Sequence, residues 1–280
     1  MNPAVPMPRL QFHPDWLVPE WPAPAHVRSV FTTRAGGVSR PPYDSLNLGQ
    51  PSDDDPDAVA ANRTLLEQAL GLAPVYMRQV HGIDTVELTA DSSEIGQPMV
   101  ADAWVTAAPG RCCAVRVADC LPVLFTDTHG SAVAAAHAGW RGLANGVLEG
   151  NFRRFEKLLR ERALPGASAR AAESCLAWLG PCIGPDAFEV GPEVRAAFVG
   201  QDPEAARCFK TKTGAPGKWF ADLAALARQR LHAMGITRIY GNDGSPSWCT
   251  VRNPSLFFSH RRDTVLLGGS GRMAACIWID

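Results

Sequence analysis

Three short segments each place a metal-binding side chain where a strand is expected to end. His81 lies in the segment QVHG, Cys120 in ADCLP and His137 in HAGWRG. Imidazole nitrogen and thiolate sulfur are preferred zinc ligands, and three protein ligands leave a fourth position for water or substrate. Zinc in such a site acidifies its bound water towards neutral pH. We therefore predict a catalytic zinc centre at these three residues, with Asp102 and Asp119 as candidates to orient the imidazoles or to cap turns.

The same residues admit other chemistry. A lone histidine or cysteine at a strand end is more often a packed core residue, and steps of 39 and 17 residues between the ligands mean that only the fold brings them together. Cys120 with His137 or His81 as its base would be the nucleophile of a cysteine hydrolase that cleaves amide bonds. A structural zinc site normally has four protein ligands. Cys182 is the candidate fourth ligand if the protein is a non-enzymatic, zinc-stabilised binding module.

Two arginines are candidates for binding an anionic substrate group. Arg141 stands at the expected start of a helix, where the helix dipole disfavours a cation and the backbone amides favour an anion. Arg34 follows an expected strand and precedes a turn at Gly36-Gly37. The alternatives are stacking of Arg141 on Trp140 and an ordinary surface position for Arg34.

Composition excludes several classes of protein. The 280 residues include 27 Lys plus Arg and 28 Asp plus Glu, a net charge of −1, and no long basic stretch of a general nucleic-acid binder. The longest apolar runs are too short to span a membrane. Residues 1–26 carry seven prolines and no export signal. We therefore expect a cytoplasmic protein with reduced cysteines, no membrane and no obligate protein partner.

The elements that must position these side chains form one catalytic domain over residues 27–280, preceded by a proline-rich arm over 1–26. Consecutive strands followed by blocks of helices favour an α+β fold over a doubly wound sheet. The expected helices cover 56–70, 142–162, 192–198 and 220–234. The expected strands cover 27–33, 75–80, 85–88, 100–106, 112–118, 123–126, 131–137, 176–179, 238–240 and 273–278.

Taken together, the short segments are far more specific than any one of them. In chain order they are TTRAGGVS from Thr32, LNLG, QVHG, ADCLP, HAGWRG, GPCIG, FEVG, FFS, RRD and GR at Gly271. This set resembles the YfiH/laccase-domain family, also called the purine nucleoside phosphorylase or peptidoglycan editing factor family and formerly labelled multicopper polyphenol oxidase. The resemblance runs from about Val27 to the C-terminus. It implies a four-layer α/β/β/α sandwich.

The resemblance also implies activities. The family's metal-binding and catalytic residues match His81, Cys120 and His137, and the arginine of its TTR segment matches Arg34. Its activities are phosphorolysis of adenosine, inosine, guanosine and methylthioadenosine, and deamination of adenosine, so purine nucleosides and phosphate are the implied ligands. A peptidoglycan-editing role, removal of L-serine from a muramyl precursor, would suit an amide hydrolase. This chain departs from the family pattern at His260, usually Tyr, and at 264–270, which looks slightly long.

The older laccase label is tested by counting ligands. A multicopper oxidase needs a blue-copper site and a trinuclear cluster fed by paired HxH motifs, whereas this sequence has seven histidines and no HxH. We therefore exclude multicopper chemistry. A single adventitious copper on the His/Cys/His site is still accommodated, because copper binds such donors more tightly than zinc does.

Overall fold

The larger of two stacked sheets carries the site. The structure is a computed structural model that describes residues 10–49, 53–92, 99–162 and 171–280. The six-stranded sheet has an antiparallel centre and one parallel pair at each edge. Its strands, in spatial order, are β11 (Arg238–Gly241), β7 (Cys175–Leu179), β5 (Leu121–Asp127), β6 (Val133–Ala138), β3 (Ala103–Thr106) and β2 (Thr85–Glu87).

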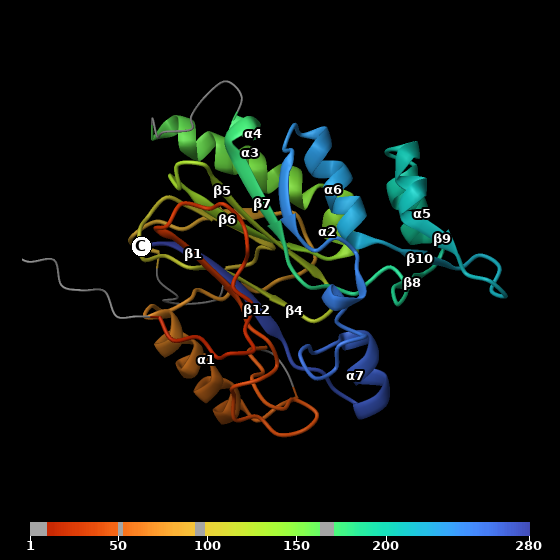
Figure 1. Cartoon of the computed structure of the whole chain (residues 1–280), viewed down its shortest axis with the longest axis horizontal. Coiled ribbons are helices and arrows are strands. Elements are labelled where there is room, and N and C mark those ends of the chain that lie inside the picture. The colour runs from red at the N-terminus through yellow and green to blue at the C-terminus, as the bar shows by residue number, and fades with distance from the viewer. Residues whose placement is uncertain (1–9, 50–52, 93–98, 163–170) are drawn as a thin grey trace, which may run out of the picture.

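The second sheet lies against one face of the first (Figure 1). It is antiparallel and has the order β1 (Val27–Phe31), β12 (Met273–Ile279), β4 (Cys113–Val117). Helices α3 (Val147–Glu161) and α6 (Leu223–Ala233) cover the free face of the six-stranded sheet, and α1 (Pro56–Leu70) covers the smaller sheet. This arrangement confirms the α+β fold and the four-layer sandwich.

Strands β5 and β6 are buried along their whole length because both faces of their sheet are covered. Side chains alternate between faces along a strand. Leu121, Val123 and Phe125 therefore belong to the core beneath α3 and α6. Leu124, together with Trp104 of β3, belongs to the core between the two sheets. The apolar runs seen in the sequence are thus strands with two buried faces.

The predicted helix over 142–162 is two helices, α2 (Trp140–Asn145) and α3. They meet at Gly146, whose φ of 98° is left-handed and ends the first helix. The predicted helix over 56–70 is confirmed as α1. Asp55 caps it by accepting a hydrogen bond from the Asp57 amide, and Gly71 ends it at φ 70°.

The predicted strand over 75–80 is wrong: in the described residues this segment has only isolated bridge positions at Val75 and Arg78, and Arg78 pairs with Val100. The reason lies in the side chain of Gln79. Its amide donates to the Arg116 carbonyl and accepts from the Arg116 amide, each at 2.9 Å. A side chain therefore occupies the edge of β4 that a strand would otherwise pair with.

The second half of the chain adds a small sheet and short helices. The predicted helix over 220–234 begins only at Leu223, because residues 219–221 form β10. Helix α7 (His260–Leu267) was not predicted, since its exposed residues Val265, Leu266 and Leu267 give no amphipathic stripe. The segment 264–270 is the end of α7 and the left-handed Gly268 that follows. The remaining elements are α4 (Ala171–Ser174), β8 (Glu189–Val190), α5 (Pro192–Val199), η1 (Pro203–Cys208), β9 (Phe209–Thr211), β10 (Trp219–Ala221), η2 (Pro246–Trp248) and α7 (His260–Leu267).

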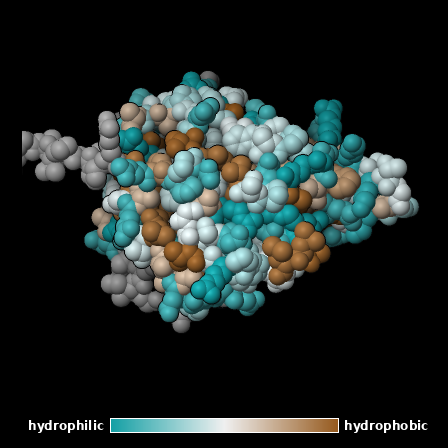
Figure 2. Space-filling model, turned by 60° about the horizontal axis from the view of Figure 1, so that its bottom comes forward, coloured by the Kyte–Doolittle hydropathy of each residue, from teal (hydrophilic) through white to brown (hydrophobic). Residues whose placement is uncertain are grey.

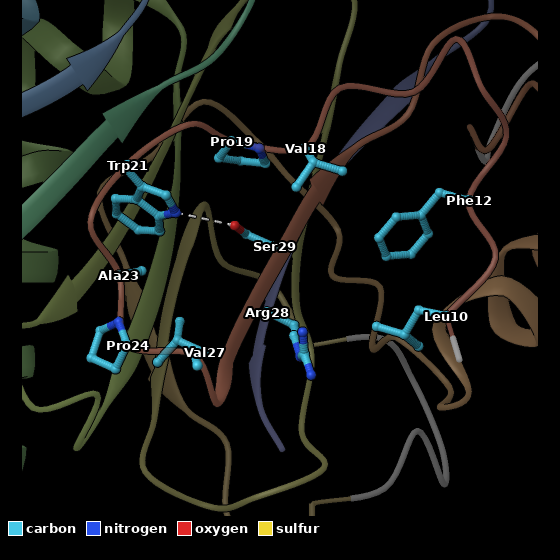
Figure 3. Close-up of a pocket in the computed structure, with 11 residues that line it drawn as sticks. Leu10, Phe12, Val18, Pro19, Trp21, Ala23, Pro24, Val27, Arg28 and Ser29 are labelled. Atoms are coloured by element: carbon cyan, nitrogen blue, oxygen red, sulfur yellow. Dashed lines mark hydrogen bonds between the residues drawn. The ribbon is translucent and has the colours of Figure 1, made fainter. Parts of the chain in front are cut away.

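The described part of the predicted arm, residues 10–26, runs along the outer edge of β1. Leu17 pairs with Phe31 there, and residues 1–9 of the arm lie outside the described residues. A cavity of about 540 Å³ is lined by residues of the arm and of β1 (Figure 3). Trp21 Nε1 donates to Ser29 Oγ across it at 3.3 Å. The described residues of its lining include no cysteine or carboxylate, so they offer no catalytic group comparable to the predicted site. The boundary between arm and domain stays a prediction.

Candidate active site

The three predicted ligands meet in space. One donor atom from each of His81, Cys120 and His137 lies within 4.8 Å of the other two. Cys120 Sγ is 3.7 Å from His81 Nε2, and the two imidazole rings lie edge to face with centroids 4.8 Å apart. Tetrahedral zinc with ordinary Zn–N and Zn–S bonds separates its ligands by roughly 3.3–3.8 Å. The Cys120–His81 distance falls in this range, and the three donors could hold one metal ion with a fourth position open.

Each ligand comes from a different part of the sandwich. Cys120 lies on the connection that carries the chain from β4 in the small sheet to β5 in the large one. His137 lies near the end of β6, where it pairs with Pro122 of β5. His81 precedes the edge strand β2. The stacking of the two sheets and the pairing of β5 with β6 therefore build the site.

Asp102 links two of the ligands. Its Oδ1 lies 2.8 Å from His137 Nδ1, and because a carboxylate only accepts, this nitrogen carries the proton and leaves Nε2 for a metal. The same carboxylate accepts the backbone amides of Val80, His81 and Gly82 at 3.0, 2.9 and 2.7 Å. These three amides converge because His81 adopts a left-handed φ of 60°. One buried carboxylate thus orients the His137 imidazole, as predicted for Asp102, and also fixes the backbone at His81.

Gly139 allows the ligands to come so close to the backbone. A Cβ at this position would lie 2.8 Å from His81 Cδ2 and 3.0 Å from Cys120 Sγ. Gly142 is similarly close to the loop that carries His81, because a Cβ there would lie 2.9 Å from the carbonyl oxygen of Gly82. The glycines of the HAGWRG segment therefore serve close packing around the triad. The helix that follows, α2, has only six residues and provides no extended N-terminal anion site.

Without metal, Cys120 and His137 have strongly shifted pKa values. Burial raises the pKa of the Cys120 thiol, but His137 and His81 outweigh burial and lower it to about 6. Burial lowers the pKa of His137, whereas Cys120 and Asp102 raise it to about 9. Burial also raises the pKa of Asp102, yet the hydrogen bonds from His137 and the backbone amides hold it below its ordinary value. At neutral pH the metal-free pair is therefore thiolate and imidazolium.

The triad opens into a cavity of about 560 Å³, a size typical of small-molecule sites. Arg141 lines this cavity, with its guanidinium 4.4 Å from the centroid of the Trp140 ring. Arg34 does not line it. Its guanidinium donates to the Asp44 carbonyl, the Asp44 carboxylate and the Pro254 carbonyl. The geometry therefore gives Arg34 no part in this cavity, and its role in substrate binding stays a prediction without structural support.

Two other candidates lie apart from the metal ligands. Asp119 binds the Thr250 hydroxyl and, at 2.6 Å, the Arg261 amide, so it fixes neighbouring loops and is not bonded to either imidazole. Cys182 is buried, and its sulfur contacts the Ile183 carbonyl and the Asn242 amide. It is not part of the His/Cys/His group, so the prediction that Cys182 supplies a fourth ligand is wrong.

Sequence reasoning missed several residues of the cavity wall. Besides the triad, Trp140 and Arg141, the lining consists of Gly49, Arg78, Gln79, Arg116, Val117, Ala118, His260 and Arg272. Arg78 lies directly before the QVHG segment, Gln79 is its first residue, and Arg272 closes the GR motif. Their place in the quoted motifs was the available signal, but a lone arginine carries no pattern that distinguishes a site from a surface.

Comparison with known proteins places this fold and site. Residues 28–280 match the model of a family described as multi-copper polyphenol oxidoreductase laccase. A purine nucleoside phosphorylase of Pseudomonas aeruginosa is 47% identical over 265 residues, covering 95% of this chain and 98% of the relative. The purine nucleoside phosphorylase YfiH of Escherichia coli is 47% identical over 268 residues, covering 94% and 98%. A solved structure from Neisseria meningitidis superposes with a TM-score of 0.83 at 45% identity, covering 95% and 99%.

The fold and site therefore define an α/β/β/α sandwich protein with a His/Cys/His group at the junction of its two sheets. The chain belongs to the YfiH family, whose model carries the laccase description. The residues do not fit the multi-copper centre in that description. Within the described residues, His81, Cys120 and His137 form the only group of three or more side chains able to hold a metal.

Proposed function

We propose that this protein is a zinc-dependent purine nucleoside phosphorylase that acts on adenosine, inosine, guanosine and methylthioadenosine and also deaminates adenosine. The observation that carries the proposal is the cavity, which joins the His/Cys/His group to four arginines. Purine nucleosides and phosphate are its proposed ligands. The names of the Pseudomonas and Escherichia relatives support phosphorolysis.

Phosphorolysis needs an anion site beside a group that favours departure of the base. A phosphate oxygen forms a bond to C1′ of the ribose while the C1′–N9 bond breaks, and the electron pair leaves with the purine. Arginine guanidinium groups bind phosphate oxygens in pairs of hydrogen bonds. Arg78, Arg116, Arg141 and Arg272 supply such groups. The Trp140 ring adds an aromatic surface to the same wall.

The zinc ligands complete the site. His81, Cys120 and His137 would hold the ion, which supplies a Lewis acid beside the substrate when bound. Asp102 keeps His137 in the tautomer that presents Nε2. By accepting the backbone amides of residues 80–82, the same carboxylate also keeps the backbone of His81 in place. No carboxylate lines the cavity within the described residues, so His260 is the available proton carrier outside the triad. Deamination therefore rests on the family resemblance more than on the lining.

The test uses purified protein of measured zinc content, incubated with adenosine with and without phosphate, with products separated by chromatography. Adenine and ribose 1-phosphate that form only with phosphate support phosphorolysis, and inosine in either case supports deamination. His81→Ala, Cys120→Ala and His137→Ala are expected to lose both activities. Absence of turnover by fully zinc-loaded wild type would contradict the proposal.

A second candidate function is favoured by one observation. Without metal, Cys120, His137 and Asp102 line up as thiolate, imidazolium and carboxylate, the arrangement of a cysteine hydrolase. Such an enzyme would cleave an amide bond, including the L-serine linkage of a muramyl precursor. Hydrolysis of that precursor by metal-free protein, and its loss after treatment with iodoacetamide, would favour this function over the phosphorylase. Zinc-protected Cys120 with nucleoside turnover would exclude it.

A further inference from the structure

Arg272 is a largely enclosed cation that forms no ion pair with a carboxylate among the described residues. It precedes β12, and its Nη1 donates to the carbonyls of Ser270 and Gly271 at 2.8 and 3.0 Å. Its backbone is fixed on both sides, since its amide donates to Asn47 Oδ1 and its carbonyl accepts from Leu48. None of the ion pairs formed among the described residues includes Arg272.

An enclosed charge without a counterion is costly unless a ligand supplies one. Burial lowers the pKa of Arg272, the direction expected when a cation is taken out of water. The carboxylate that acts on it electrostatically is Asp119, which already accepts from Thr250 and Arg261. The Cys120 thiolate acts on Arg272 more strongly than Asp119 does, and Tyr43 acts on it more weakly. Arg272 therefore faces the reacting end of the cavity.

Two further arginines share this wall. Arg116 projects from β4, and its Nη2 donates to the Met77 carbonyl at 2.7 Å while its guanidinium lies 5.6 Å from the Tyr76 ring centroid. Arg78 is exposed at the rim and is not among the ion-paired arginines of the described residues. Among the described residues, the lining contains no aspartate or glutamate there. The wall is therefore an arginine-rich surface that an oxyanion would neutralise.

We propose that Arg272 and Arg116, with Arg78 at the rim, form the phosphate subsite of this cavity. The proposal rests on the proposed phosphorylase function and assigns the inorganic co-substrate to one wall. Phosphate held there lies beside the triad. Arg272 is the anchor, because it is the enclosed cation that gains most from a counterion, and its planar guanidinium binds two phosphate oxygens at once.

The experiment titrates zinc-loaded protein with inorganic phosphate in a calorimeter, with and without adenine, and measures steady-state phosphorolysis of adenosine. Arg272→Met is expected to weaken phosphate binding and to raise the KM for phosphate by at least about tenfold, with a much smaller change in the KM for adenosine. Arg272→Lys keeps the charge and loses the planar guanidinium. Its KM for phosphate is expected to lie between those of wild type and Arg272→Met. Arg252→Met, which removes an exposed arginine outside the cavity, is the matched control. Thermal unfolding checks that each variant is folded.

Deamination of adenosine needs no phosphate and is expected to survive in Arg272→Met. Wild-type phosphate affinity in that variant, or equal loss of deamination and phosphorolysis in the folded variant, would overturn the subsite. Failure of wild type to bind phosphate under both conditions would also overturn it. Arg272-dependent phosphate binding without any phosphorolysis would leave the subsite standing and refute the proposed function. The two failures are therefore distinguishable.

Discussion

Gly139 sets how closely the metal ligands approach the backbone. Its φ of −64° and ψ of 157° are accessible to any residue. An alanine here would therefore clash with neighbouring side chains without straining the backbone. Because a Cβ would lie 2.8 Å from His81 Cδ2, Gly139→Ala is expected to displace that imidazole. We predict a loss of zinc affinity of at least about tenfold, the size of effect seen when ligand orientation is disturbed. Competition with a chromophoric chelator measures it.

Gly150→Ala is the matched control for this change. It lies in α3, and its Cβ would meet nothing closer than the Ile83 carbonyl oxygen at 3.4 Å. The control should keep wild-type zinc affinity and gain about 0.5–1 kcal/mol of stability from helix propensity. Equal zinc affinity in Gly139→Ala and wild type would show that the close approach is unimportant.

Cys120 gives a pH prediction for the metal-free protein. Its pKa of about 6 lies below the 8.5 of an ordinary thiol, so the reactive thiolate persists down to about pH 6 and is lost below that value. Alkylation by iodoacetamide, followed by mass spectrometry, should therefore have its half-maximal rate near pH 6. Zinc should protect the sulfur until a chelator is added. A midpoint near pH 8.5 would contradict the thiolate–imidazolium pair.

Local signals in the chain explain which elements were predictable. Asp55, Pro56 and Gly71 mark both ends of α1, and each acts within a few residues of its own position. The break at Gly146 and the side-chain pairing of Gln79 escaped prediction. The apolar periodicity of a helix continues across one left-handed glycine, so the break at Gly146 leaves no signal. An apolar run has the same sequence whether or not its backbone pairs with a neighbouring strand. Helix α7 escaped because its apolar residues face solvent.

Helix α6 supplies a prediction at this scale. Its N-cap, Asp222, accepts the Ala225 amide at 2.9 Å, while burial raises its pKa despite that bond and the nearby Arg228. A raised carboxyl pKa means that folding binds the proton more tightly. Wild type therefore loses stability as pH rises above the unfolded pKa of about 3.9 and through the raised folded value.

Asn caps a helix as well as Asp does and does not ionise. We therefore expect Asp222→Asn to be more stable than wild type at pH 7, with the difference vanishing near pH 3. Asp222→Ala is expected to lose about 1 kcal/mol at either pH, because the cap itself is gone. Denaturant unfolding across this pH range measures both variants. A lower stability of Asp222→Asn at pH 7 would show that ionised Asp222 is stabilising.

On the scale of the whole molecule, the site ties the two sheets together. Its ligands come from the β4–β5 connection, the end of β6 and the loop before β2, so a bound ion bridges segments that unfolding would separate. A ligand that binds only the folded state at a hundred times its Kd stabilises it by about 2.7 kcal/mol. For a chain of this size we predict a rise in Tm of roughly 5 °C on adding zinc.

Cys120→Ala should abolish that rise. Cys208→Ala, which removes a partly buried cysteine outside the His/Cys/His group, should keep it. Differential scanning calorimetry with zinc-loaded and chelator-treated samples measures the shift. An equal shift in Cys120→Ala would place the stabilising ion elsewhere.

The surface adds two facts at this scale. No helix in the described part of the chain is both long and apolar enough to cross a membrane, and the cytoplasmic location stays a prediction. Figure 2, which turns the lower side forward, shows a largely hydrophilic surface with hydrophobic residues gathered in compact patches. Helix α7 lies on that side, with Val265 and Leu266 79% and 72% exposed.

The sequence by itself determined the fold class, the family and the identity of the three candidate ligands, because their residue types and flanking glycines form recognisable segments. Only the tertiary structure decided which carboxylate serves them. Asp102 reaches His137 because β3 and β6 pair in the register that sets Ala103 opposite Ala136, while Asp119 turns away to Thr250.

The arginine wall likewise belongs to the tertiary structure alone. Arg272 stands 152 positions beyond Cys120 in the chain (272 − 120), yet both line one cavity. Sequence patterns record periodicity and neighbours within a few residues. Contacts between distant segments depend on strand register and on how the two sheets stack. No local sequence pattern predicts either of them.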